Sequence, residues 1–203
     1  MAVTRERFEQ GITYDEFKAQ MTRNQSRFEA NERRFELDPA SLAAFQSLPR
    51  PLNVLVLAED WCGDVIDNLP ILGRIAATSG KLNVRIFLRD KNLDLMDQYL
   101  NQGKFRSIPT MVFFDDDFNE IGRFTERPAS VTERRAQRRL EIFAQHPEFG
   151  SPDKPIDQLP EDVRAQLQEA IAAMRDELKP VDNRDVVREL IGIVEQAHAA
   201  PRV

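Results

Sequence analysis

The only cysteine of the chain lies where a thiol can act as a nucleophile. Cys62 follows the run Glu59-Asp60-Trp61 and precedes Gly63, after the most apolar stretch of the sequence and at the start of a helical pattern. A thiol at the beginning of a helix faces unpaired backbone N–H groups and the positive end of the helix dipole. Both favour the thiolate, the reactive form of cysteine. The position therefore predicts thiol chemistry, with a small buried structural side chain as the alternative.

Carboxylates crowd the same segment. Glu59, Asp60, Asp64 and Asp67 all lie within five residues of Cys62. Nearby negative charge opposes ionisation of a thiol, whereas the helix terminus favours it, so the sign of the net effect is left open. Asp60 and Asp64 are also candidates for the residue that caps the helix.

Short apolar runs predict the strands that must position this segment. Leu52–Ala58 is nearly continuous in apolar residues, which is typical of a parallel strand covered on both faces. Further strands are expected at 82–88, 110–114 and 119–125, the last two joined as a hairpin by a turn of three aspartates. A short strand is also expected at 33–37.

Helical patterns alternate with these strands and continue beyond them. Thr13 and Glu16 have the spacing of a capping box at the start of a first helix. Helices are expected at about 13–31, 39–48, 62–78, 92–101 and 129–146, with two more separated by Pro180. The order predicts an α/β fold, in which a mixed central sheet has helices on both faces and helical extensions at both ends.

Composition divides the chain into four parts. These are an N-terminal helical extension at 1–31, a core domain at 32–146, a proline-rich linker at 147–160 and C-terminal helices at 161–203. The last core helix carries a basic cluster of Arg134, Arg135, Arg138 and Arg139. Because glutamates interrupt this cluster, it is interpreted as a solvated helix face.

The residues around Cys62 resemble the active site of the thioredoxin family. Trp61-Cys62-Gly63 follows a buried strand, Pro70 stands eight residues after Cys62, and Ile108-Pro109-Thr110 opens a later strand. The resemblance covers about residues 32–146 and is strongest to a thioredoxin-like branch with a Trp-Cys-Gly-Asp pattern and helical extensions. It implies a thioredoxin-like fold with Ile108 and Pro109 in the cis-proline loop beside the cysteine. The substrate-binding residues that it implies are Trp61, Gly63, Ile108, Pro109 and Thr110.

Two departures from the family pattern bear on the chemistry. Val65 occupies the place of the second cysteine, which in thioredoxins releases the mixed disulfide within the molecule. Val56 occupies the place of a buried acid that assists proton transfer in that family. We therefore expect Cys62 to attack a disulfide but to need an external thiol to complete the exchange.

Three functions follow from these residues. The first is a single-cysteine thiol–disulfide oxidoreductase, whose partners would be proteins or low-molecular-weight thiols and disulfides. The second is a non-catalytic module that binds an extended peptide between Trp61 and Pro109, which the two valines favour. The third resembles single-cysteine glutaredoxins, which bridge a cluster with glutathione. It ranks last because the loop reads Ile-Pro-Thr rather than Thr-Val-Pro.

Composition argues against other classes. The chain has 203 residues and a formal net charge of −6, so nucleic-acid binding through a basic surface is not expected. One cysteine excludes an intrachain disulfide, and the two histidines lack ligand spacing, so neither a metal nor a cofactor is expected. No apolar run approaches the about 18 residues of a membrane span, and no secretory signal is expected. A cytoplasmic protein is expected, and the oligomeric state is left open.

Overall fold

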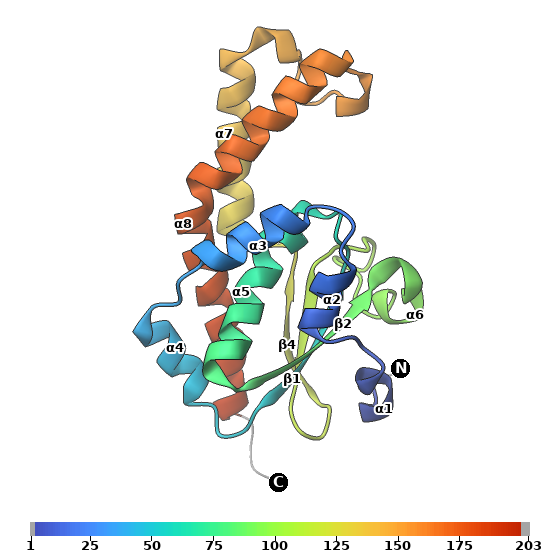
Figure 1. Ribbon diagram of the computed structural model, residues 1–203, viewed down its shortest axis with the longest axis vertical. Coiled ribbons are helices and arrows are strands. Elements are labelled where there is room, and N and C mark those ends of the chain that lie inside the picture. Colours follow the sequence, from blue (N-terminus) through green and yellow to red (C-terminus); the bar gives the residue numbers. More distant parts are fainter. Residues whose placement is uncertain (1–2, 200–203) are drawn as a thin grey trace. The chain divides into compact units, whose positions relative to one another are not determined.

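A four-stranded mixed sheet forms the centre of the larger of two compact units (Figure 1). The computed structural model describes residues 3–199. The strands are β1 (Leu52–Ala58), β2 (Leu82–Leu88), β3 (Thr110–Phe114) and β4 (Glu120–Thr125), in the spatial order β2-β1-β3-β4. β1 pairs in parallel with β2 and antiparallel with β3, and β3 and β4 form the expected hairpin.

β1 is the innermost part of this unit. All seven of its residues are buried, as its nearly continuous apolar sequence predicts for a strand covered on both faces. A neighbouring strand lies on each side of it, so it is not an edge strand. The carboxyl end of β1 therefore delivers the chain to the rim of the sheet, where chemistry in α/β sheets is commonly found.

Helices surround the sheet within the same unit. They are α1 (Arg5–Glu9), α2 (Tyr14–Gln20), α3 (Gln25–Arg34), α4 (Pro39–Gln46), α5 (Gly63–Ser79) and α6 (Leu93–Met96), preceded by a 3-10 turn at Arg89–Lys91, together with the part of α8 from Val186 onward. α3 and α4 both pack against α5, and α5 packs against β2. The expected α/β class, a mixed sheet with additional helices at both ends, is confirmed.

Local capping signals mark several helix ends correctly. Thr13 and Glu16 form the predicted capping box at the start of α2. Asp38 caps α4 by accepting a hydrogen bond from the Ser41 N–H at 2.9 Å. Gly80 ends α5 in the left-handed conformation, with φ of 64°, a region that glycine enters without steric cost.

Three predicted elements of the larger unit were wrong in their extent. The helix expected at 13–31 is divided into α2 and α3 by a break in which Asn24 has φ of 56°. The strand expected at 33–37 is absent, because α3 continues to Arg34 and the buried Phe35 ends it rather than pairing with a strand. The helix expected at 92–101 is reduced to the single turn of α6.

The smaller unit spans residues 128–185. It contains α7 (Ala129–Gln145), 3-10 turns at Pro147–Phe149 and Ile156–Gln158, and the first part of α8 (Glu161–Ala199). Its apolar core is formed by Phe143, Phe149 and Leu167.

Buried ion pairs join the two helices of the smaller unit, which corrects the interpretation of the basic cluster. Arg134 and Arg135 both pair with Asp182, and Arg134 also pairs with Asp185. Arg135 is only 8% exposed, so it is not on a solvated face. Arg138 remains at the surface, where it pairs with Glu177.

The two expected C-terminal helices are one continuous helix, because α8 passes through Pro180. A proline inside a helix removes one hydrogen bond and costs about 3 kcal/mol in isolation. Asp182 and Asp185, which follow it, are both held by arginines of α7. These tertiary contacts keep the backbone helical where the local sequence favours a break.

The contacts group the chain differently from the ranges drawn from composition. Residues up to Arg127 form one unit with those from Val186 onward, and the intervening segment forms the other. The expected ranges 1–31 and 161–203 extend into residues 1–2 and 200–203, which lie outside the described residues. None of the helices in the described part of the chain is long and apolar enough to cross a membrane.

Candidate functional site

Cys62 occupies the turn between β1 and α5. It is the residue immediately before the first helical residue, Gly63, with extended backbone angles of φ −84° and ψ 120°. Its side chain is partly exposed. The cysteine therefore stands at the helix N-terminus expected from the sequence, where the helix dipole stabilises negative charge.

The loop before β3 lies directly beside this thiol. The antiparallel pairing of β1 with β3 sets Leu57 opposite Thr110, at the same end of the sheet as Cys62. The Cys62 thiol donates a hydrogen bond to the Ile108 carbonyl oxygen, with a sulfur-to-oxygen distance of 3.4 Å. The Ile108–Pro109 peptide bond is cis. Two sequence-predicted segments, 61–63 and 108–110, are thus brought together.

The predicted substrate-binding residues differ in exposure. Trp61 is 41% exposed, whereas Ile108 and Pro109 are buried. Thr110 is completely buried, and its hydroxyl donates to the Ser107 carbonyl oxygen at 2.9 Å. The side chain of Thr110 therefore holds the shape of the loop, and the surface that a substrate could meet is formed mainly by the residues around Trp61.

Two of the nearby carboxylates are engaged by backbone N–H groups. Asp60 accepts hydrogen bonds from the N–H groups of Thr22 and Arg23, at 2.7 and 3.0 Å. Burial opposes ionisation of Asp60, but these hydrogen bonds together outweigh it and lower its pKa. Glu59 accepts from the Asp90 N–H at 2.8 Å, yet burial raises the pKa of Glu59.

The other two carboxylates pair with arginines. Asp64, in the first turn of α5, pairs with Arg127, and Asp67 pairs with Arg27 at 3.1 Å. Asp60 does not make the helix cap that was expected from Asp60 or Asp64. It accepts hydrogen bonds from the break between α2 and α3 instead. Because Asp64 and Asp67 have cationic partners, the negative charge near the thiol is partly compensated.

Arg127 belongs to the site although no sequence pattern pointed to it. The residue before it, Glu126, has φ of 57°, and its N–H donates to the Pro109 carbonyl oxygen at 2.7 Å. The Asn68 amide of α5 donates to the Glu126 carbonyl oxygen, also at 2.7 Å. This clamp directs Arg127 back to Asp64, so a cation from the end of β4 lies at the start of the cysteine-bearing helix.

Trp61 is covered by a second arginine that the sequence did not single out. The Arg89 guanidinium lies over the Trp61 ring, 4.8 Å from its centroid, which is the geometry of a cation–π contact. Arg89 also donates to the Arg106 carbonyl oxygen at 3.3 Å. The exposed indole is therefore linked to the segment that leads into the Ile108 loop.

The two family positions at which this chain has valine are sealed inside the protein. Val56 and Val65 are both completely buried. Val56 lies in β1, and Val65 lies in the first turn of α5. Position 65 therefore has no thiol and position 56 has no carboxyl group. A mixed disulfide on Cys62 would have no resolving cysteine.

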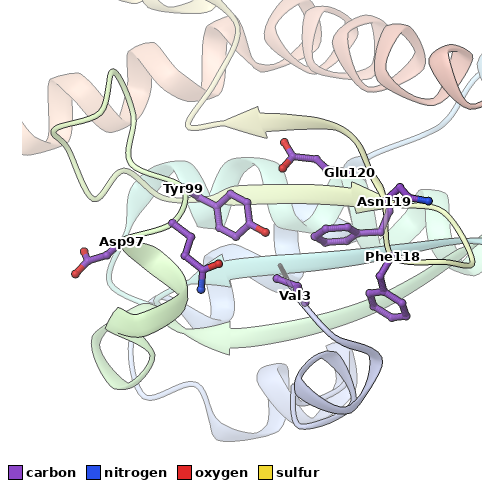
Figure 2. Close-up of a pocket in the computed structure, with 8 residues that line it drawn as sticks. Val3, Asp97, Tyr99, Phe118, Asn119 and Glu120 are labelled. Carbon is purple, nitrogen blue, oxygen red and sulfur yellow. The ribbon is translucent and has the colours of Figure 1, made fainter. Parts of the chain in front are cut away.

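A pocket of about 660 Å³ lies elsewhere in the larger unit (Figure 2). Val3, Tyr99, Phe114 and Phe118 contribute to its walls. Phe114 pairs with Asn53 near the beginning of β1, so this part of the pocket is at the opposite end of the strand from Cys62. None of the predicted site residues lines it.

Comparisons with known proteins agree with this geometry. Residues 11–139 match a family described as thioredoxin. A protein of unknown function from Pseudomonas aeruginosa, PA1234, is similar with a TM-score of 0.67 and 22% identity, over 98% of this chain and 100% of that one. An HIV epitope scaffold is similar with a TM-score of 0.63 and 22% identity, over the same shares, 98% and 100%. These two structures are similar in fold.

No curated protein sequence matches the chain. The family match nevertheless covers more than half of the residues and includes Cys62 and the Ile108 loop. The thioredoxin-like fold expected from the residues around Cys62 is confirmed, and this protein is a member of the thioredoxin family.

Proposed function

We propose that this protein exchanges thiols and disulfides through the single cysteine Cys62. The observation that carries the proposal is the position of this thiol, partly exposed at the N-terminus of α5 and beside the loop with the cis Ile108–Pro109 bond. The helix terminus favours the thiolate, and the engaged carboxylates limit the opposing charge. In this proposal Trp61 and Gly63 shape the surface, and the 108–110 loop orients the partner.

The exchange proceeds in three steps. The Cys62 thiolate attacks one sulfur of the partner's disulfide, so that a new S–S bond forms, the partner's S–S bond breaks, and the departing thiolate takes a proton from water. An external low-molecular-weight thiolate then attacks the mixed disulfide, restores Cys62 and becomes joined to the partner's sulfur. A second external thiol reduces that bond, so two external thiols are oxidised for each partner disulfide reduced. A reducing compartment such as the cytoplasm would supply these thiols.

A non-catalytic module that binds peptides is the second candidate. It is favoured by the complete burial of Val65 and by the contact of the Cys62 sulfur with the Ile108 carbonyl oxygen. In the thioredoxin family the backbone of that loop pairs with the substrate peptide. A thiol that remains bonded to the loop would support packing rather than reaction.

Mixed-disulfide trapping separates the two candidates. The folded protein is incubated at pH 7 with hydroxyethyl disulfide, and its intact mass is followed with time. We expect one adduct, its loss on addition of excess thiol, and no adduct in Cys62→Ser. A Cys62 that reacts only after unfolding would refute the exchange function and leave the binding module.

A second variant tests whether the scaffold can still perform dithiol chemistry. Val65→Cys places a thiol one helical turn after Cys62, where the family has its resolving cysteine. We expect the adduct on Cys62 to be released spontaneously, as an intramolecular disulfide forms. An adduct as long-lived as in the wild-type protein would contradict this expectation.

A further inference from the structure

A strip of aromatic and cationic side chains, all but one of them exposed, extends from the neighbour of Cys62 to the segment before Ile108. We call it the aromatic–basic strip, and it consists of Trp61, Arg89, Lys104, Phe105 and Arg106. Its two rings are well exposed, Trp61 at 41% and Phe105 at 49%. Exposed aromatic side chains of this size are typical of interaction surfaces.

Direct contacts make the strip continuous. Arg89 lies over the Trp61 ring and donates to the Arg106 carbonyl oxygen. The Lys104 ammonium lies over the neighbouring Phe105 ring, 5.2 Å from its centroid. Arg106 stands two residues before Ile108, whose carbonyl oxygen contacts the Cys62 thiol. The strip therefore begins at the thiol and continues away from it along the segment that enters β3.

The strip carries three cationic side chains, two of which have carboxylate partners. Arg89 pairs with Asp90 at 2.7 Å, and Arg106 pairs with Asp97 at 2.7 Å. In the part of the chain that the structure describes, Lys104 has no carboxylate partner, since its charge meets only the Phe105 ring. With Asp90 and Asp97 included, these residues carry one net positive charge in a protein with a net charge of −6, and Lys104 is the cation that is complementary to an acidic partner.

We propose that the aromatic–basic strip binds an acidic, extended segment of a protein partner next to the disulfide that Cys62 attacks. This inference rests on the proposed function and names its substrate class. A small disulfide would contact Cys62 and Trp61 only. The five side chains of the strip together offer contacts to several residues of a polypeptide. Carboxylates of the partner would meet Lys104 and the two arginines, and its apolar groups would meet the two rings.

Overall charge and local charge make opposite predictions, which permits a sharp test. Three peptides carry one cysteine, activated as a mixed disulfide with the same nitrothiobenzoate group, and are flanked by glutamates, glutamines or lysines. The released chromophore gives the second-order rate constant with the wild-type protein. We expect the acidic peptide to react about tenfold faster than the basic one at low salt, and the ratio to shrink as salt screens the charges.

A matched pair of variants locates the effect. Lys104→Gln removes one charge from the strip, whereas Arg50→Gln removes one charge before the start of β1, at the other end of the strand. We expect the ratio of acidic to basic rates to fall severalfold in Lys104→Gln and to stay unchanged in Arg50→Gln. A faster basic peptide, or equal ratios in the two variants, would overturn the strip while leaving the exchange function intact.

Binding without chemistry provides a separate readout. Trp61 is the only tryptophan of the chain, so its fluorescence reports occupancy of the strip. Peptides with serine in place of cysteine are titrated into the protein, and saturable quenching is expected from the acidic peptide and not from the basic one. If no activated peptide reacts, the exchange function fails, and this titration alone then tests whether the strip binds an acidic segment. No preference for the acidic peptide would overturn the proposed binding.

Discussion

Gly73 of α5 is a position at which the cysteine-bearing helix has no room for a side chain. A Cβ atom at Gly73 would stand 2.7 Å from the Tyr14 hydroxyl oxygen and closer still to two carbons of its ring, inside the 3.0 Å limit that such atoms keep. The Tyr14 ring packs on Phe28, and its hydroxyl donates to Glu32 at 3.0 Å. Gly73→Ala must therefore displace Tyr14 and weaken the contact of α2 with α5.

The expected magnitude follows from opposing terms. Replacing glycine by alanine in a helix stabilises it by about 1 kcal/mol. Overpacking costs about 1–3 kcal/mol, and loss of a hydrogen bond to a charged acceptor costs about 1.5–3 kcal/mol when it is complete. Because Tyr14 is only partly buried and can move outward, we expect a net destabilisation of about 2 kcal/mol. This lowers the melting temperature by about 4–8 °C for a chain of this length.

The assay is thermal unfolding followed by circular dichroism, with Gly192→Ala as the control. Gly192 lies in α8, and no described atom lies within 4 Å of a Cβ at that position. The control therefore receives the same helix-propensity gain without a clash, and it is expected to be stabilised by up to about 1 kcal/mol. A Gly73→Ala protein as stable as the wild type or more stable would refute the reasoning.

Two further predictions concern buried charge. Burial raises the pKa of Glu59 in the folded protein above the unfolded value of about 4.3. Protonated Glu59 therefore stabilises the folded state fully below the unfolded pKa, and this contribution to the free energy of unfolding is lost as the pH rises through the folded pKa. Glu59→Gln keeps an acceptor for the Asp90 N–H and does not ionise. The free energy of unfolding of this variant in urea, relative to that of the wild type, should therefore rise between pH 4 and pH 7, and a constant difference would contradict the raised pKa. In the smaller unit, Arg135→Ala should cost about 2 kcal/mol, because Asp182, which is 2% exposed, keeps Arg134 but loses its bond to Arg135. Arg138→Ala at the surface should cost under about 1 kcal/mol in the same denaturation assay. Equal costs would show that burial of the pair is not what matters.

Much of the site could be predicted because its signals are local. The continuous apolar run of β1, the cysteine before a helical pattern and the proline at the start of β3 each depend only on neighbouring residues. Burial of a strand on both faces disfavours polar residues along most of its length, so the nearly continuous apolar run identifies β1. The same holds for the capping box at Thr13, since its two hydrogen bonds close within four residues.

The sequence by itself therefore determined the order of the strands along the chain, the fold class and the position of Cys62 at a helix start. Tertiary structure alone decided where α3 begins, because the side chain that holds the preceding break is Asp60, far along the chain. It also decided that α8 continues through Pro180, and that Arg127 and Arg89 reach Asp64 and Trp61. The physical reason is common to these cases. Ion pairs, cation–π contacts and long-range hydrogen bonds depend on which distant residues the fold brings together, and they can outweigh local preferences of about 1–3 kcal/mol.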